Sequence, residues 1–206
     1  MRTDSIAYVV AGMAFGTILG WVVGTQQVHR AATPAAETPA PANQTAAAGG
    51  TGRQAPTLDQ ARVQDLQKQV TSNPKDVSAV IQLGNTYFDA ERWDDAITWY
   101  RKAIELDPKN ADASTDLGVS LYYSNRADEA LAQFEHSLKI SPKHTKTLLN
   151  KGIVLAFGKQ DLRGAAAEWE KVVTLAPNSP EGQAARRALE GIAAAHANGT
   201  TPPSNQ

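Results

Sequence analysis

The chain has 206 residues, a formal net charge of −1 and no cysteine. A charge so close to zero gives no support for binding to nucleic acid or to an anionic membrane surface, both of which attract strongly basic proteins. The lack of cysteine excludes disulfides, thiol nucleophiles and cysteine-ligated metals, and the length allows one or two domains.

Residues 1–30 are predicted to form an N-terminal transmembrane anchor. The stretch from Ile6 to Val23 carries no charge and is apolar apart from Thr17. As a helix it would come close to the roughly 30 Å thickness of the hydrocarbon core of a bilayer. A cleaved signal peptide is the alternative, although its apolar core is usually shorter and no A-x-A-like cleavage site follows closely.

The flanking charges barely distinguish the two orientations of this span. The long, almost uncharged linker behind it favours a C-terminal part outside the membrane. In a Gram-negative bacterium this would be an inner-membrane protein whose C-terminal part lies in the periplasm.

Four glycines in the span recur at every fourth position: Gly12, Gly16, Gly20 and Gly24. Such a stripe lets two membrane helices approach closely, which favours a homodimer or a partner helix, although glycine is also common in membrane helices.

Residues 31–56 are predicted to be a flexible linker, because alanine, proline, threonine and glycine dominate there and only Glu37 and Arg53 are charged. Residues 57–75 are predicted to form a capping helix with Thr57 as its N-cap. The end of this helix aligns with the ends of the repeats that follow, which is typical of a degenerate half-repeat at the end of an array.

A pattern of 34 or 35 residues then repeats over 76–109, 110–143 and 144–178. Its period predicts stacked helix pairs, with first helices at 76–89, 110–123 and 144–157 and second helices at 93–106, 127–140 and 162–175. Each copy has a glycine, an aromatic residue and a closing proline: Gly84, Tyr100 and Pro108; Gly118, Phe134 and Pro142; Gly152, Trp169 and Pro177. A glycine inside a helix costs about 1 kcal/mol against alanine. Three in register predict that a neighbouring helix, with its ring, needs the space of a Cβ.

The third copy has one extra residue, placed near Asp161. Residues 179–197 are predicted to form a C-terminal capping helix, capped by Ser179 and with Ala185, Leu189 and Ile192 on its inner side. The tail, 198–206, is expected to be disordered.

These repeats resemble the tetratricopeptide repeat (TPR) at Leu83, Gly84, Tyr87, Ala96 and Pro108 and at most of the corresponding positions in the later copies. The departures are Val80, Ser114 and Leu148, where the family often has tryptophan, and Lys151 in place of the usual leucine. The resemblance implies an all-α solenoid of about three helical hairpins between capping helices. An anchor, a linker and such repeats are together similar to the TPR subunits of bacterial cytochrome c maturation, which present the apoprotein to the haem-attachment machinery.

In this family the first helix of each pair lines a concave groove. The resemblance therefore places a set of candidate peptide- or partner-binding residues there: Ile81, Asn85, Phe88, Thr115, Val119, Tyr122, Tyr123, Lys146, Leu149, Asn150, Ile153 and Phe157. Aromatic and aliphatic side chains with a few amides suit an extended or helical peptide with apolar anchors. The alternative is that some of them, Phe88 and Tyr122 especially, pack between neighbouring repeats.

One family variant clamps a C-terminal carboxylate between lysines, asparagines and an arginine. Asn85 and Lys146 fit that arrangement, but Ile81, Asp116 and Asn150 stand at the other positions. An aspartate there would repel a carboxylate, so no clamp is predicted.

No catalytic site, cofactor or metal site is predicted. The four histidines lack metal-ligand spacing, and the common nucleotide, hydrolase and metalloprotease motifs do not occur. Asp112 and Asp116 share a helix face, but two carboxylates alone are more typical of solvated surface than of acid–base catalysis. Two functions remain: a membrane-anchored adaptor whose groove binds a peptide or partner segment to assemble an envelope complex, or a self-associating membrane scaffold without a dedicated peptide ligand.

Overall fold

The computed structural model describes residues 56–197, which contain eight α-helices and no strand. The helices are α2 (Gln60–Ser72), α3 (Val77–Asp89), α4 (Trp93–Leu106), α5 (Ala111–Tyr123), α6 (Ala127–Ile140), α7 (Thr145–Ile153), α8 (Leu162–Leu175) and α9 (Pro180–Ala197). Within this part of the chain no helix is both long and apolar enough to cross a membrane. The predicted anchor with its glycine stripe, all but the last residue of the linker and the tail lie outside the described residues.

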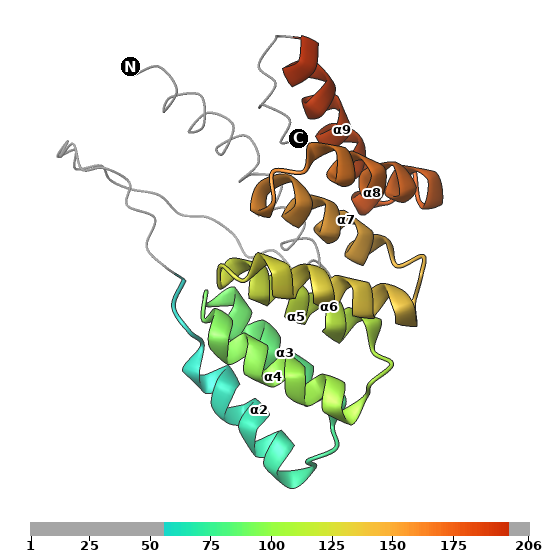
Figure 1. Cartoon of the computed structure of the whole chain (residues 1–206). Helices are drawn as coiled ribbons and strands as arrows, with labels where there is room; N and C mark the ends of the chain where they lie inside the picture. Colours follow the sequence, from blue (N-terminus) through green and yellow to red (C-terminus); the bar gives the residue numbers. More distant parts are fainter. Residues whose placement is uncertain (1–55, 198–206) are drawn as a thin grey trace, which may run out of the picture. The chain divides into compact units, whose positions relative to one another are not determined.

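Consecutive helices pack as hairpins: α3 on α4, α5 on α6 and α7 on α8 (Figure 1). The hairpins stack in chain order, with α2 against α3 at one end and α9 against α8 at the other. The prediction of an all-α hairpin solenoid is therefore confirmed for residues 56–197. The helix ends expected for the first two repeats are correct to within one residue, whereas α2 begins and ends three residues inside the predicted range 57–75.

In each hairpin an aromatic ring of the second helix packs directly on the backbone of a glycine in the first helix. A Cβ on Gly84 would lie 2.6 Å from Cε1 of Tyr100, and one on Gly118 would lie 2.5 Å from Cε1 of Phe134. In the third hairpin the indole of Trp169 occupies the same place, over Gly152. All three rings are at most 2% exposed. The predicted reason for the repeated glycines is thus confirmed, and the same crossing occurs three times.

The turns inside the hairpins show where the extra residue of the third repeat is accommodated. Glu91, Asn125 and Gln160 each take a positive φ, of 57°, 61° and 58°. In the third hairpin a π-helical turn, η2 (Val154–Gly158), precedes this position, and Lys159 N donates to Val154 O at 3.1 Å. A single inserted residue in a helix commonly produces such a π turn. The expected position near Asp161 is therefore wrong, because the first helix absorbs the residue before its turn.

The first and last helices differ from the sequence prediction in detail. Asp59, not Thr57, caps α2, because its carboxylate accepts a hydrogen bond from Arg62 N at 2.9 Å. At the other end the expected cap is confirmed, since Ser179 Oγ accepts from Gly182 N at 3.0 Å.

The inner side of α9 is built mainly of small residues. Ala184, Ala185 and Ala188 are at most 4% exposed, whereas the expected Leu189 and Ile192 are only partly buried. A Cβ on Gly182 would overlap the Ala176 carbonyl, so α9 lies very close to the end of α8. Such a close approach favours alanine over leucine along the contact.

Candidate functional site

The first helices α3, α5 and α7 carry all but one of the twelve residues expected to contact a partner; the exception is Phe157, in the π turn. We call the side of α3, α5, α7 and η2 that bears the twelve the first-helix face. Seven of them keep part of their surface exposed: Ile81, Asn85, Phe88, Val119, Tyr122, Tyr123 and Lys146. Phe157 is 40% exposed. These eight are placed where a partner could reach them.

The other four expected contact residues are buried. Thr115, Leu149, Ile153 and Asn150 are 0%, 1%, 5% and 8% exposed. The Asn150 amide donates to Lys146 O at 2.8 Å, which fixes it within its own helix. These side chains pack between helices, so the structure gives them a role in the fold and not in direct contact.

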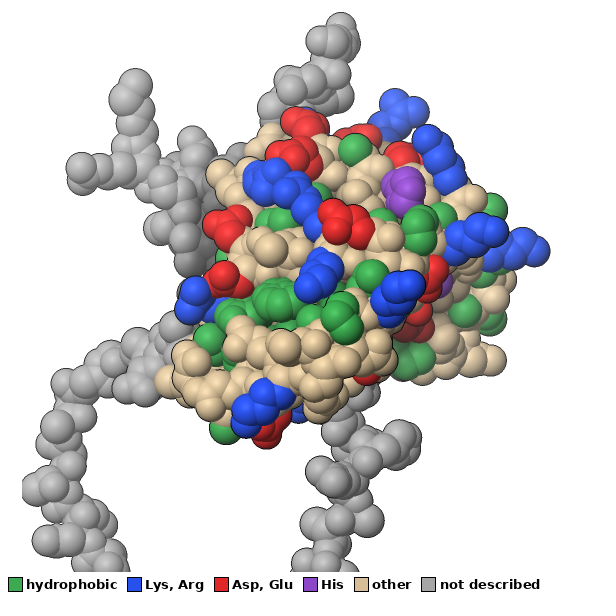
Figure 2. All heavy atoms as spheres, turned by 90° about the horizontal axis from the view of Figure 1, so that it is seen from below, with side chains coloured by type: hydrophobic (Ala, Val, Ile, Leu, Met, Phe, Trp, Pro, Cys, Tyr) green, Lys and Arg blue, Asp and Glu red, His purple; other side chains and the backbone are tan. Residues whose placement is uncertain are grey.

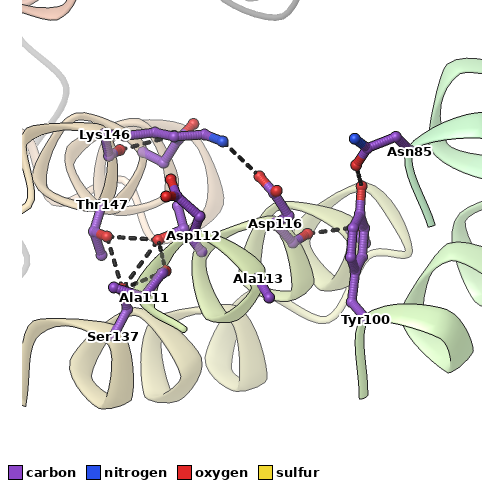
Figure 3. A network of polar contacts seen from close by, with 12 residues as sticks. Asn85, Tyr100, Ala111, Asp112, Ala113, Asp116, Ser137, Lys146 and Thr147 are labelled. Carbon is purple, nitrogen blue, oxygen red and sulfur yellow. Dashed lines mark hydrogen bonds and ion pairs between the residues drawn. The ribbon is translucent and has the colours of Figure 1, made fainter. Parts of the chain in front are cut away.

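Thr115 belongs to a buried cluster of hydroxyl groups between the second and third repeats; Figure 3 labels two other members, Ser137 and Thr147. Its Oγ1 lies 2.6 Å from Thr147 Oγ1 and 3.0 Å from Ser137 Oγ, and it donates to the Ala111 carbonyl at 2.7 Å. His144 Nδ1 lies 2.6 Å from Thr147 Oγ1. Buried polar groups are stable only when they are paired, and within residues 56–197 none is left without a partner.

Two charged residues of the first-helix face, Lys146 and Asp116, neutralise each other. Lys146 Nζ lies 2.7 Å from an oxygen of Asp116, and both side chains are about four-fifths buried. Burial acts to lower the pKa of the lysine, but Asp116 outweighs it and the pKa is raised, so the ammonium keeps its charge. Burial raises the pKa of the Asp116 carboxyl, against the opposing effect of Lys146. Beside this pair, the hydrogen bond from His144 holds the pKa of Asp112 below its usual value.

Asn85 is also engaged within the fold. Its Oδ1 accepts a hydrogen bond of 2.7 Å from the hydroxyl of Tyr100, the ring that lies on Gly84 (Figure 3). Burial, with smaller contributions from Asp116 and Asp89, raises the pKa of this phenol, so it remains a donor. The two residues that fitted a carboxylate clamp, Asn85 and Lys146, therefore both have partners inside the protein.

Four aromatic rings meet where α3 and α5 end and α4 begins. We call Phe88, Trp93, Tyr122 and Tyr123 the aromatic surface. The rings of Trp93 and Tyr123 stack at 4.7 Å between centroids, and Phe88 lies edge-on to both, at 4.8 and 5.7 Å. Tyr122 follows at 5.8 Å from Tyr123. All four side chains are partly exposed, and Phe88 and Tyr122 also pack against the core between the repeats, as the alternative for these two residues expected. The four rings therefore form one cluster across the first two repeats that keeps part of its surface exposed.

Sequence reasoning missed Trp93 because it considered only first helices. Trp93 begins α4, directly after the turn of the first hairpin, where a second helix meets the end of the first. An aromatic residue at the start of a second helix was the available signal.

The charged side chains outside these sites show no separation by sign on the face drawn in Figure 2. Lysine and arginine are interspersed there with aspartate and glutamate around a strip of apolar side chains. Within residues 56–197 no group of three or more histidines and acids is arranged to hold a metal.

Comparison with known proteins agrees with this geometry. The TPR repeat family matches residues 84–124. Solved structures with similar folds include the first TPR of Spaghetti (RPAP3) bound to the HSP90 peptide SRMEEVD, with a TM-score of 0.53 and 26% identity over 59% of this chain and 93% of that one. The findings support a TPR protein.

Two further solved structures have similar folds. The first TPR domain of human RPAP3 has a TM-score of 0.54 and 26% identity, covering 61% of this chain and 96% of its own. The structure of MamA has a TM-score of 0.53 and 17% identity, covering 66% and 88%, and at that identity it shows the fold alone. A comparison with curated proteins gave no match.

Proposed function

We propose that this TPR protein is a membrane-anchored adaptor that binds a peptide or a segment of a partner protein on its first-helix face. The observation that carries the proposal is the aromatic surface: four rings, all partly exposed, gathered from three helices. Large rigid rings supply much contact area at a low cost in conformational entropy, and they are enriched among the residues that dominate binding energy. A similar TPR domain bound to a peptide supports this use of the fold.

The bound segment is expected to be an extended chain or a short helix with apolar anchors. An acidic C-terminal tail such as SRMEEVD is a poor candidate for this chain. The ammonium of Lys146 is already neutralised by Asp116, and the Asn85 carbonyl oxygen already accepts the Tyr100 hydroxyl. A carboxylate arriving there would have to displace an internal partner and face the charge of Asp116.

The place of action proposed here is the cell envelope. The uncharged apolar stretch from Ile6 to Val23 supports a single membrane span, and the linker behind it would hold the repeats away from the bilayer. We propose that the protein lies in the bacterial inner membrane with its repeats in the periplasm, where it assembles an envelope complex; cytochrome c maturation is one pathway of this kind. A topology reporter fused after Gln206 tests the side of the membrane.

The experiment that tests the adaptor function compares three versions of the full chain, captured after crosslinking in its own cells. In the first, Tyr122→Ala and Tyr123→Ala remove half of the aromatic surface. In the second, Trp99→Ala removes a partly exposed ring from α4, outside the aromatic surface, as a matched control. The third is the unaltered chain.

A partner that is captured with the unaltered chain and the Trp99 control, and lost with the tyrosine variant at unchanged helical circular dichroism, supports the proposal. Equal capture by all three contradicts it. A further variant of the full chain, Gly16→Ile with Gly20→Ile, tests the alternative. If it loses the crosslinked dimer and the captured protein, while the tyrosine variant keeps both, the self-associating scaffold is favoured.

A further inference from the structure

The aromatic surface is bordered by carboxylates. Asp89 and Asp94 directly follow Phe88 and Trp93 in the chain, and Glu91 lies in the turn between them. The Ser124 hydroxyl donates to Asp94 at 3.4 Å, which holds that carboxylate beside the end of α5. Burial, with contributions from Tyr122 and Glu91, raises the pKa of Tyr123, so Glu91 lies near that ring. Glu91 and Asp94 thus lie near the rings, and Asp89 directly follows Phe88 at the end of α3.

None of these three carboxylates forms a salt bridge within residues 56–197. The cations of the neighbouring turns have other partners: Arg92 pairs with Asp95 at 2.6 Å, and Arg126 pairs with Glu129 at 2.6 Å. Lys159, from the third hairpin, pairs with Asp128 at 2.7 Å. Arg62 acts on Asp89 only from a distance, and burial outweighs its effect and raises the pKa of that carboxyl. Arg126 likewise acts on Asp94 from a distance. The border of the aromatic surface therefore carries three carboxylates that no salt bridge within residues 56–197 neutralises.

From this arrangement we infer that the aromatic surface binds a cationic segment of a partner protein, in which lysine or arginine side chains flank apolar anchors. The inference rests on the proposed function and specifies the chemistry of the partner. Cations are attracted to the faces of tryptophan and tyrosine rings, and the bordering carboxylates pair with the same side chains. Lys146 does not oppose such a ligand, because Asp116 neutralises it. An acidic segment would meet carboxylates of its own sign that have no salt-bridge partner within residues 56–197.

The test uses the full chain in a non-ionic detergent and two labelled synthetic peptides. Both peptides have leucine and phenylalanine at the same positions. In one, the charged positions are lysine and arginine, and in the other they are glutamate. Binding is followed by fluorescence anisotropy at low salt and at about 0.5 M salt, where exposed charges are largely screened.

Two triple variants distinguish the effect of the bordering carboxylates on peptide binding from the effect of the protein's net charge. The border variant combines Asp89→Asn, Glu91→Gln and Asp94→Asn. The control variant combines Glu105→Gln, Glu170→Gln and Glu190→Gln, which neutralise three exposed acids on α4, α8 and α9. Because each exposed charge contact contributes modestly, loss of all three should make the border variant bind the cationic peptide roughly tenfold more weakly. The control variant should bind it within about twofold of the unaltered chain. Circular dichroism verifies that both variants are folded.

The inference is supported if three results are obtained. The cationic peptide binds more tightly than the acidic peptide, its affinity falls at high salt, and its affinity falls in the border variant but not in the control variant. Equal or tighter binding of the acidic peptide overturns it, and so does an unchanged affinity in the border variant or no binding of either peptide. These failures differ from failure of the adaptor function. A partner captured from cells in a manner that depends on Tyr122 and Tyr123 would keep the adaptor function even if its segment proved acidic.

Discussion

The substitution Gly118→Ala should destabilise this protein, although the same change in an ordinary helix stabilises it. Glycine inside a helix costs about 1 kcal/mol relative to alanine, so helix propensity alone predicts a gain of that size. Here the new Cβ would lie 2.5, 2.7 and 3.1 Å from three carbons of the Phe134 ring, which is 0% exposed. Carbon atoms prefer separations of about 3.5–4.0 Å, so the ring would have to move by about 1 Å inside a filled core.

Overpacking of this kind costs about 1–3 kcal/mol, and a rigid, fully enclosed ring belongs to the upper half of that range. After the gain in helix propensity, the expected net loss is roughly 1–2 kcal/mol. Urea denaturation of the full chain, followed by circular dichroism, should therefore show a lower midpoint for Gly118→Ala with an unchanged slope. The control is Ala132→Gly, at an exposed position of α6, which should lose about 1 kcal/mol from helix propensity alone.

A double variant identifies the ring as the cause. Phe134→Leu vacates part of the space beside Gly118, so adding Gly118→Ala in that background should cost nothing or should stabilise. The two changes would then be coupled by about 1 kcal/mol or more, as expected for residues in contact. A gain of about 1 kcal/mol from Gly118→Ala in the unaltered background would refute the packing argument, because it would mean that the ring does not need the space.

Three more predictions concern the ends and the charges of the repeats. Asp59→Ala should cost about 1 kcal/mol, whereas Thr57→Ala should change the stability by only a few tenths, because Asp59 is the cap of α2. Lys151 Nζ lies 2.8 Å from Glu168, a buried carboxylate that also pairs with Lys171. Lys151→Leu should therefore lower the free energy of unfolding by about 1–3 kcal/mol, because it leaves a buried charge with one partner fewer. The double variant Lys151→Leu with Glu168→Leu should recover most of that loss. Burial acts to raise the pKa of Glu168, but hydrogen bonds from the two lysines outweigh it and hold that pKa below its ordinary value of 4.5. In urea denaturation the unaltered chain should therefore have a higher free energy of unfolding than Glu168→Gln. This difference should be complete above about pH 4.5 and should shrink as the pH falls through the lower pKa of the folded state. A difference that grows on acidification would contradict the assignment.

The repeating architecture could be predicted from the sequence because one physical requirement recurs. A glycine, a ring and a closing proline return at nearly the same spacing, and each set has the same structural role, as Gly84 with Tyr100 and Gly118 with Phe134 illustrate. Lys151, which departs from the family pattern, also has a local explanation, since it pairs with the buried Glu168. The π turn could not be located, because the sequence shows that a residue is added but not which helix accommodates it.

The candidate site was less predictable than the fold. A helix face assigned by position in the repeat does not show how deeply the next repeat covers it, so Thr115 and Leu149 were expected to contact a partner and are buried. The hydroxyl cluster around Thr115 involves two further helices, which no local pattern connects. Trp93 was missed because only the first helices were considered, although its ring lies against Phe88 and Tyr123, which belong to two of them.

Site-specific photocrosslinking in the native cells tests the binding surface most directly. A photoreactive phenylalanine derivative is introduced at position 122, within the aromatic surface, or at position 132, on the exposed side of α6. We expect a discrete crosslinked species at position 122 that contains a lysine- or arginine-rich segment of another protein, and no such species at position 132. No crosslink at 122, or the same products at both positions, would contradict the proposal that this surface holds a partner.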